Sequence, residues 1–253
     1  MWNVDYWFVL RNLTSKDFKI RYRNMSLGIF WSLCNPLIMM SVLTFIFTKI
    51  FPSPRPAFPV FILCGLVPFN FFTTTWVNGT NCLVDQAGLV KRVPLPRILL
   101  PIANVVSSCF HLMIQIGLLL SFTLAFGFPI NRYWALLPLV WFFEIVFVLG
   151  LVMASSALDV YVRDVRYIVE SATMVLFWMV PVFYSFDVIP QRYRDFYQFN
   201  PVAAIVLASR NILLDAAPPP SALLWKLGGS SIFICLIGYL IFERLHKRFY
   251  EHL

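Results

Sequence analysis

The chain has 253 residues, of which 60% are hydrophobic and 13% are charged, about half the charged fraction of a soluble domain. This composition excludes an ordinary soluble fold, and the positions of the basic residues indicate that the net charge of +8 serves a membrane surface, not nucleic acid. The sequence has no GxxxxGK[ST], HExxH or GxSxG pattern, its 3 histidines are scattered and its 5 cysteines form no CxxC pair. We therefore expect no catalytic residues, no metal site and no cofactor bound by this chain.

Residues 1–25 predict an amphipathic helix at the cytosolic face of the membrane. Lys16, Lys19 and Arg23 follow the i, i+3, i+7 spacing of one helix face, and Phe18, Tyr22 and Met25 lie on another face. Such a helix lies in the interface, with its apolar side in the headgroup region. A solvated cytosolic helix is the alternative interpretation.

Long apolar stretches predict an all-α integral membrane protein with six transmembrane helices, since about 20 apolar residues cross the hydrocarbon layer as a helix. The predicted spans are residues 26–50, 59–82, 101–126, 134–157, 167–186 and 225–243. Six spans place both ends on one side. With both termini in the cytoplasm, 13 of the 20 basic residues lie inside and 7 outside, so the positive-inside rule favours this orientation, with a cytosolic tail at 244–253.

Residues 83–98 predict a cytosolic coupling segment between the second and third spans. Within it, residues 89–97 (LVKRVPLPR) form an apolar and basic turn of helix that Pro94 and Pro96 interrupt. A short rigid knob of this kind suits docking into a partner protein. A basic inner loop that only follows the positive-inside rule is the alternative, and the spacing of the residues by itself favours this alternative.

Glu144 lies near the middle of the fourth predicted span. A carboxylate there costs about 2.5–3.5 kcal/mol on insertion scales, so it should face a bundle interior, a pore or a partner. A proton relay usually needs a chain of such groups, and a structural hydrogen bond is the favoured interpretation.

Residues 187–215 predict a periplasmic pair of short helices that is re-entrant or interfacial. The apolar run at 196–209 would make about 21 Å of helix, too short to cross about 30 Å of hydrocarbon. Asn200 and Pro201 match an N-cap and a first helical position, so a helix should begin there. The aromatic fraction of 17% serves lipid-facing surfaces by default, and some rings could line a conduit.

Several segments in order along the chain resemble the polysaccharide and polyol-phosphate export permeases, the membrane subunits of ATP-binding-cassette exporters for O-antigen, capsule and teichoic acid. The resemblance covers nearly the whole chain and departs from the family pattern at Gln86, Leu95 and Ile98, where Asn, Phe and Glu are usual. The matching segments are residues 21–31 (RYRNMSLGIFW), 35–36 (NP), 65–72 (GLVPFNFF), 89–97 (LVKRVPLPR), 163–164 (RD), 177–184 (FWMVPVFY), 189–190 (IP), 200–201 (NP) and Arg210.

The resemblance implies a homodimer that works with two copies of a separate ATPase subunit, on which ATP and Mg²⁺ bind. A pore at the dimer interface would carry a lipid-linked polysaccharide across the bacterial inner membrane. Residues implied in ATPase coupling are Arg21, Tyr22, Arg23, Leu89, Lys91, Arg92, Pro94, Pro96, Arg97, Arg163 and Asp164. Residues implied in the pore or its gate are Phe69, Phe72, Trp178, Tyr184, Pro190, Tyr193, Phe196, Tyr197, Asn200 and Pro201.

The leading functional prediction is therefore a permease subunit for export of a lipid-linked polysaccharide, with O-antigen first and capsule or teichoic acid polymers as the nearest variants. A proton-coupled secondary transporter that uses Glu144 is the alternative from another class. A structural membrane subunit without a pore is a third. A stoichiometric ATPase partner would separate the first hypothesis from the other two.

Overall fold

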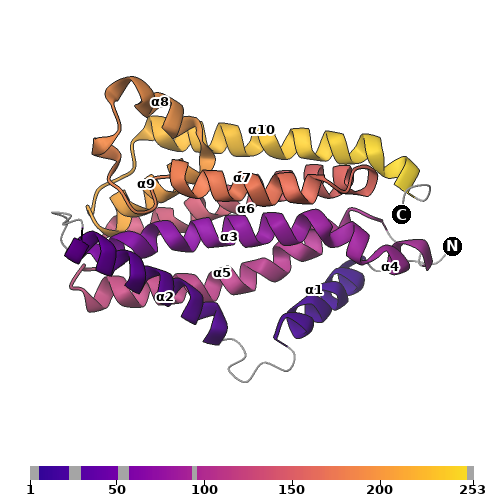
Figure 1. The fold of residues 1–253 in the computed structure, drawn as a ribbon, viewed down its shortest axis with the longest axis horizontal. Helices are drawn as coiled ribbons and strands as arrows, with labels where there is room; N and C mark the ends of the chain where they lie inside the picture. Colours follow the sequence, from indigo (N-terminus) through magenta and orange to yellow (C-terminus); the bar gives the residue numbers. More distant parts are fainter. Residues whose placement is uncertain (1–5, 23–29, 51–56, 93–95, 250–253) are drawn as a thin grey trace.

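The computed structural model describes residues 6–22, 30–50, 57–92 and 96–249 (Figure 1). All regular elements in these ranges are helices, which confirms the predicted all-α class. The elements are α1 (Tyr6–Tyr22), α2 (Trp31–Phe45), η2 (Ile46–Ile50), α3 (Phe58–Asp85), α4 (Ala87–Arg92), α5 (Leu99–Ala125), η3 (Arg132–Leu136), α6 (Leu137–Tyr161), α7 (Val165–Met179), η4 (Phe186–Val188), α8 (Gln191–Phe199), α9 (Pro201–Leu213), α10 (Ser221–Leu245) and η5 (His246–Arg248).

Five continuous helical stretches are long and apolar enough to cross a membrane. They are Trp31–Ile50, Phe58–Asp85, Leu99–Ala125, Arg132–Tyr161 and Ser221–Arg248. The remaining predicted span, residues 167–186, covers most of the 15-residue helix α7 and the irregular segment that follows it. The total of six spans stays a prediction.

Helix α7 ends at Met179 because a proline follows two residues later. Pro181 has no N–H to donate and its ring excludes the helical conformation from the residue before it. Val180 accordingly adopts an extended backbone, with φ −76° and ψ 137°. The chain then runs irregularly through residues 180–185 before η4, α8 and α9.

Helix α3 is the centre of the bundle. It packs against α2, α5, α6, α7 and α9, and 72% of its most apolar 18-residue stretch is buried, against 22% of the corresponding stretch of α10. Every residue from Val60 to Phe69 is buried, so this part of the helix has no lipid-facing stripe. A helix that is apolar all round belongs in a core.

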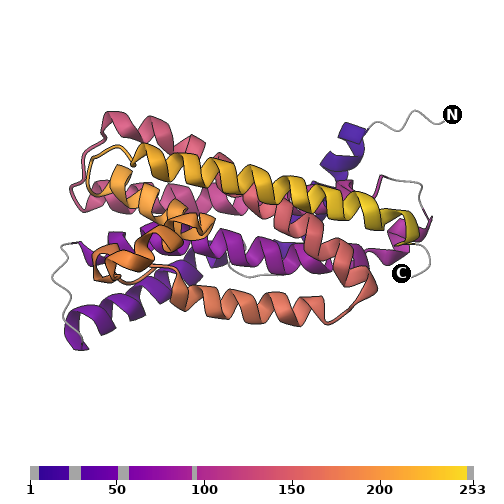
Figure 2. The same cartoon turned by 90° about the horizontal axis from the view of Figure 1, so that it is seen from above.

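The two ends of the molecule carry different elements (Figures 1 and 2). Helix α4, the turn between α6 and α7, and the end of α10 lie together at one end, which we call the coupling end. A separate apolar cluster, which includes Leu13, Leu83, Val90, Leu100 and Phe242, holds this end together. Helix α8 lies at the opposite end, which we call the gate end.

Helices α6 and α10 form an extensive contact in which two glycines bring the backbones together. A Cβ atom at Gly150 would lie 2.5 Å from Cys235 Cα, and a Cβ atom at Gly238 would overlap the carbonyl oxygen of Gly150. Small residues at helix crossings let membrane helices approach closely and gain van der Waals contact. The crossing therefore depends on the absence of side chains at both positions.

We expect Gly238→Ala to lower the stability of the protein by about 1–3 kcal/mol, the usual cost of overpacking, because the added methyl group meets backbone that cannot rotate away. Gly229→Ala is the matched control on the same helix, since a Cβ atom there meets nothing within 4 Å. It should be neutral or stabilising, because alanine is the better helix former. Thermal unfolding of the two purified variants in detergent checks this, and equal midpoints would contradict the close crossing.

Candidate functional site

The coupling end joins the N-terminal helix to the segment between the second and third predicted spans. Leu13 of α1 packs in one apolar cluster with Leu89 and Val90 of α4. Lys91 is exposed on α4, and Arg163 and Asp164 are exposed in the turn between α6 and α7. The structure thus brings together, at one end, predicted coupling residues from two separate parts of the sequence, with Leu13 of α1 packed beside the first of them.

Several predicted coupling residues lie partly or wholly outside the described residues. Arg23 and Pro94 fall outside the described ranges. For Arg21, Tyr22 and Arg92 only the helical backbone is described. Pro96 is described and exposed beside Arg97.

Arg97 makes its contacts with the C-terminal part of the same chain. Its guanidinium donates a hydrogen bond to the carbonyl oxygen of His246 and lies 5.7 Å from the centre of the Phe249 ring. The hydroxyl of Tyr161 donates to the Leu245 carbonyl at 2.8 Å. These contacts attach the end of α10 to the coupling end, so substitution of Arg97 would also affect the protein's own structure.

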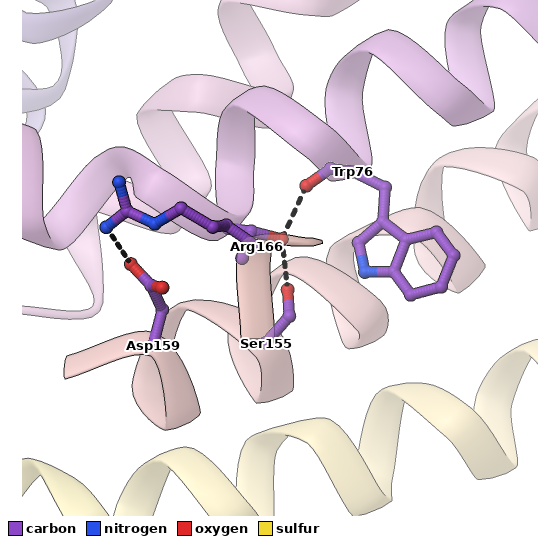
Figure 3. A network of polar contacts seen from close by, with 5 residues as sticks. Trp76, Ser155, Asp159 and Arg166 are labelled. Carbon is purple, nitrogen blue, oxygen red and sulfur yellow. Dashed lines mark hydrogen bonds and ion pairs between the residues drawn. The ribbon is translucent and has the colours of Figure 1, made fainter. Parts of the chain in front are cut away.

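Asp159 and Arg166 form an ion pair across the turn that contains Arg163 and Asp164 (Figure 3). The Asp159 side chain is fully buried, and its Oδ2 lies 3.2 Å from a guanidinium nitrogen of Arg166. A buried carboxylate needs such a partner, because an unpaired charge in a poorly solvated place is costly. The pair therefore links the end of α6 to the start of α7.

A hydroxyl contact between α3 and α6 lies beside this ion pair (Figure 3). Thr80 Oγ1 lies 2.8 Å from both the Trp76 carbonyl oxygen and Ser155 Oγ. Hydrogen bonds of this kind are often found between membrane helices. Together with the ion pair, they connect three helices next to the exposed turn.

At the gate end, Arg210 of α9 organises the irregular segment after α7. This side chain is 5% exposed, and its guanidinium donates to the carbonyl oxygens of Pro181 and Val182, both at 2.6 Å. It also donates to the Phe61 carbonyl at 3.3 Å and lies 3.5 Å above the Phe61 ring. We call Arg210 with these acceptors the carbonyl clamp.

The carbonyl clamp satisfies backbone groups that the break in α7 leaves without helical partners. Irregular backbone at membrane depth is tolerated only where protein or a water-filled cavity covers it. A guanidinium has five N–H donors in a fixed fork, so one side chain can serve several carbonyls. Arg210 therefore joins the broken segment to both α9 and α3.

Gly65 allows the broken segment to approach α3. A Cβ atom at this position would lie 2.9 Å from the Val182 oxygen and 3.0 Å from Val182 Cα. Both are backbone atoms, so a larger residue would push the segment away from the carbonyl clamp. The glycine in the 65–72 motif thus has a steric explanation.

Two short helices, α8 and α9, occupy the segment predicted to form the gate, and their role as a gate stays a prediction. Asn200 Oδ1 accepts a hydrogen bond from Val202 N at 3.1 Å, and Pro201 begins α9, so the predicted N-cap is confirmed. Lys226 of α10 donates to Gln198 of α8 at 3.0 Å. Because 11 residues of α9 are buried, this short helix is part of the protein core.

The predicted pore residues occupy different environments. Phe69 and Phe72 are buried in α3. The centre of the Phe69 ring lies 5.4 Å from that of Phe177, and the centre of the Phe72 ring lies 5.8 Å from that of Phe147. Trp178, by contrast, is 68% exposed. Only the Trp178 ring of these three reaches the outer surface of the chain, and the pore role of all three stays a prediction.

The remaining gate residues lie around α8. Tyr184 is half-buried, and its hydroxyl donates to the Met179 carbonyl at 2.7 Å across the break. Pro190 and Tyr193 are exposed, whereas Tyr197 is partly buried. The Phe196 side chain lies outside the described residues.

Glu144 is fully buried in α6, so it faces the interior of the chain. We expected a structural hydrogen bond, but neither carboxylate oxygen has a hydrogen-bond partner among the described residues. The same described ranges contain no group of three or more His, Cys, Asp or Glu side chains that could hold a metal ion. The chemistry of the two ends is instead that of hydrogen bonds and ion pairs that hold helices in place.

Arg210 and Gly65 are structural residues whose roles sequence reasoning missed. The charge count placed Arg210 with the outer basic residues, although its side chain is buried. The available signal was its position at the end of α9, in helical register with Ala203 and Val206 on an apolar face. An arginine in that register requires buried acceptors.

These features define a multi-pass helical membrane protein. Hydrogen bonds and an ion pair hold its helices together at one end, and the carbonyl clamp supports the irregular segment after α7 at the other. A family model described as ABC-2 type transporter matches residues 9–214. The chain belongs to this family and is a permease subunit in the inner membrane, which confirms the resemblance found in the sequence.

Named relatives cover almost the full length. An O-antigen export system permease protein, RfbA, from Klebsiella pneumoniae is 28% identical over 99% of this chain and 97% of the relative. Its counterpart from Myxococcus xanthus is 27% identical over 98% and 96%. The polysialic acid transport protein KpsM from Escherichia coli is 23% identical over 79% and 78%.

Proposed function

We propose that this chain is the membrane-spanning permease subunit of an ATP-binding-cassette exporter that moves a lipid-linked O-antigen polysaccharide across the inner membrane. The observation that carries the proposal is the end-to-end similarity to O-antigen export permeases from two bacteria, which leaves almost no part of either chain unmatched. The similarity to KpsM is lower and covers less of the chain, which favours O-antigen over a capsule polymer.

ATP hydrolysis belongs to a separate subunit in this proposal, with two ATPase copies that bind ATP and Mg²⁺ and no catalysis by this chain. The coupling end would face those subunits in the cytoplasm, together with both termini. The positive-inside rule supports this orientation, because it places 13 of the 20 basic residues in the cytoplasm. The grouping of Lys91, Arg163 and Asp164 at one end supports it as well.

The exporter would contain two copies of this chain with the pore between them. One chain buries its own central helix α3 completely at Val60 to Phe69, so no channel for a polymer runs through the bundle there. The exposed Trp178 ring beside the break in α7 offers an apolar face to sugar C–H surfaces without demanding fixed hydrogen bonds. A sliding polymer needs such contacts.

The proton-coupled alternative is not favoured. It depended on Glu144 alone, whereas the family and the relatives are those of ATP-binding-cassette transport. A structural subunit without a pore would match the same fold, and a transport assay separates it from an exporter.

Deletion of the gene for this chain from its own bacterium should remove O-antigen from the cell surface, because the polymer is then made but not exported. Antibody binding to intact and to permeabilised cells measures export and synthesis separately. The complementing protein, purified from membranes, should retain an ATPase subunit in equal amount. Normal surface O-antigen in the deletion strain would rule out the proposed function.

A further inference from the structure

A cavity of about 180 Å³ lies at the gate end, where α8, α9 and α10 meet. Leu207, Arg210 and Asn211 follow the i, i+3, i+4 spacing of one helix face, so the C-terminal half of α9 forms one wall. Gln198 of α8 and Leu223 of α10 border the cavity from the other two helices. We call this space the gate-end cavity.

The turn after α9 places a carboxylate at the gate-end cavity. Asp215 N donates to the Arg210 carbonyl oxygen at 3.2 Å, and Ala217 N donates to the Asn211 carbonyl oxygen at 2.9 Å. These bonds fold the chain back onto the last turn of α9, so the side chains of Asn211 and Asp215 line the same space. Asp215 is exposed and Asn211 is partly buried, which leaves both accessible to a ligand.

The polar groups of this lining have unused hydrogen-bonding capacity. Within the described part of the chain, the side chains of Asn211 and Asp215 make no hydrogen bond or ion pair. Gln198 Oε1 accepts from Lys226 at 3.0 Å, which leaves the N–H groups of this amide as donors. Amides donate and accept, whereas a carboxylate only accepts. A ligand that satisfies these groups must therefore carry donors and acceptors close together.

The charges of the lining argue against an anion, a metal ion and a purely apolar ligand. The carboxylates of Asp187 and Asp215 repel a phosphate, and the Arg210 guanidinium already serves the carbonyl clamp. The same guanidinium repels a metal ion, and the described residues hold no group of three or more His, Cys, Asp or Glu side chains for one. An apolar molecule would leave Asn211 and the Gln198 amide without partners.

A neutral sugar ring meets these conditions. Its neighbouring hydroxyl groups donate to a carboxylate and accept from an amide. Its C–H faces pack on apolar side chains, which Leu207, Leu223 and the Phe186 ring supply here. Pockets for drug-sized ligands measure about 300–1,000 Å³, so a cavity of about 180 Å³ suits one ring and not a longer saccharide.

We propose that the gate-end cavity binds one neutral sugar unit of the exported polymer where the polymer leaves the membrane. Asn211 donates to a hydroxyl group of the ring, Asp215 accepts from a neighbouring hydroxyl group, and Leu207 and Leu223 cover a C–H face. A site for one ring binds weakly enough to release it again, as transport requires. The inference rests on the proposed function, which supplies the identity of the ligand as the polymer.

The test uses the purified full-length chain in phospholipid nanodiscs, which avoids the sugar headgroups of common detergents. The probe is the repeating-unit oligosaccharide of the bacterium's own O-antigen, obtained by partial acid hydrolysis. Saturation-transfer NMR should show transfer from the protein to ring protons of the oligosaccharide, above the background of empty nanodiscs. No transfer above that background would overturn the proposal. Displacement of the oligosaccharide by glycerol 3-phosphate would do so as well, because it would indicate a polyol-phosphate ligand.

Two variants assign the binding to the gate-end cavity. Asn211→Leu keeps the side-chain size and should weaken binding about fivefold, the effect of one lost hydrogen bond. Leu207→Phe keeps every polar group but fills the space, so it should also weaken binding at least about fivefold. Gln191→Leu is the control, because this exposed amide of α8 does not line the cavity. Unfolding midpoints report whether the variants fold. Unchanged transfer in folded Asn211→Leu and Leu207→Phe proteins would remove the site, as would an equal loss in Gln191→Leu.

The site and the proposed function fail separately. If deletion of the gene removes surface O-antigen but the purified protein shows no saturation transfer, the exporter assignment stands and the sugar site is wrong. Normal surface O-antigen in the deletion strain would overturn the exporter assignment itself, and the identity of the ligand would fall with it even if saturation transfer is seen.

Discussion

Replacing Arg210 with methionine is expected to abolish export and to lower the stability of the isolated protein. Methionine has a similar length but cannot donate to the carbonyls of Pro181, Val182 and Phe61, which Arg210 now satisfies. Each buried acceptor left without a partner costs about 1–3 kcal/mol. The segment after α7 should then separate from α3 and α9, so the unfolding midpoint and surface O-antigen should both fall.

Arg132→Met is the matched control for this change. Arg132 is an exposed arginine at the same end of the molecule, where its guanidinium donates to the Tyr133 hydroxyl and lies over the Tyr133 ring. Arg210→Lys should give an intermediate result, since an ammonium group keeps the charge but lacks the planar fork. If Arg210→Met unfolds at the same temperature as Arg132→Met, the carbonyl clamp has no structural role.

Charge reversal at Lys91 and Arg92 is expected to separate ATP hydrolysis from export. Both residues belong to α4 at the coupling end, and Lys91 is exposed. In the proposal, the basic side chains of α4 meet acidic groups of the ATPase. A pair of glutamates would place negative charge against negative charge there, and like charges at an interface cost several kcal/mol. Export should fall by at least about tenfold, the effect of about 1.4 kcal/mol, while the protein still folds and inserts.

Arg97 is left unchanged in that experiment because it holds the His246 carbonyl and the Phe249 ring. Arg244→Glu is the control, because it reverses a charge on an exposed residue at the end of α10. Surface O-antigen and the amount of co-purified ATPase are measured for both proteins. Normal export by Lys91→Glu/Arg92→Glu would exclude the coupling role of α4.

The helices and one cap were predictable because their causes are local. Runs of apolar residues determine where a helix is stable in lipid, and the Asn200–Pro201 pair determines where α9 begins. The end of α7 was missed, since residues 167–186 were treated as one span although Pro181 lies within them. The proline was visible, but the acceptors and donors that make a break tolerable come from elsewhere in the chain.

The carbonyl clamp illustrates this limit. Arg210 and Phe61 are 149 residues apart, and no periodicity in the sequence connects them. The buried aromatic residues also show that a sequence pattern does not reveal tertiary contacts. Phe69 and Phe72 belong to a motif that suggested a pore, but neighbouring helices enclose α3 and bury both rings. A helix that is apolar all round has no polar face, so its sequence does not reveal which rings face a substrate.

The position of α9 also bears on how the protein is assembled during synthesis. A helix of 13 residues is about 20 Å long and cannot be released into lipid as a span of its own, least of all with a buried arginine. Domains form in the order in which the ribosome delivers them, and every acceptor in the carbonyl clamp precedes Arg210 in the chain. By the time α9 is synthesised, α3 and the break after α7 already exist to receive it. Because the acceptors are synthesised first, the nascent protein does not pass through a stage in which the Arg210 guanidinium has no acceptors.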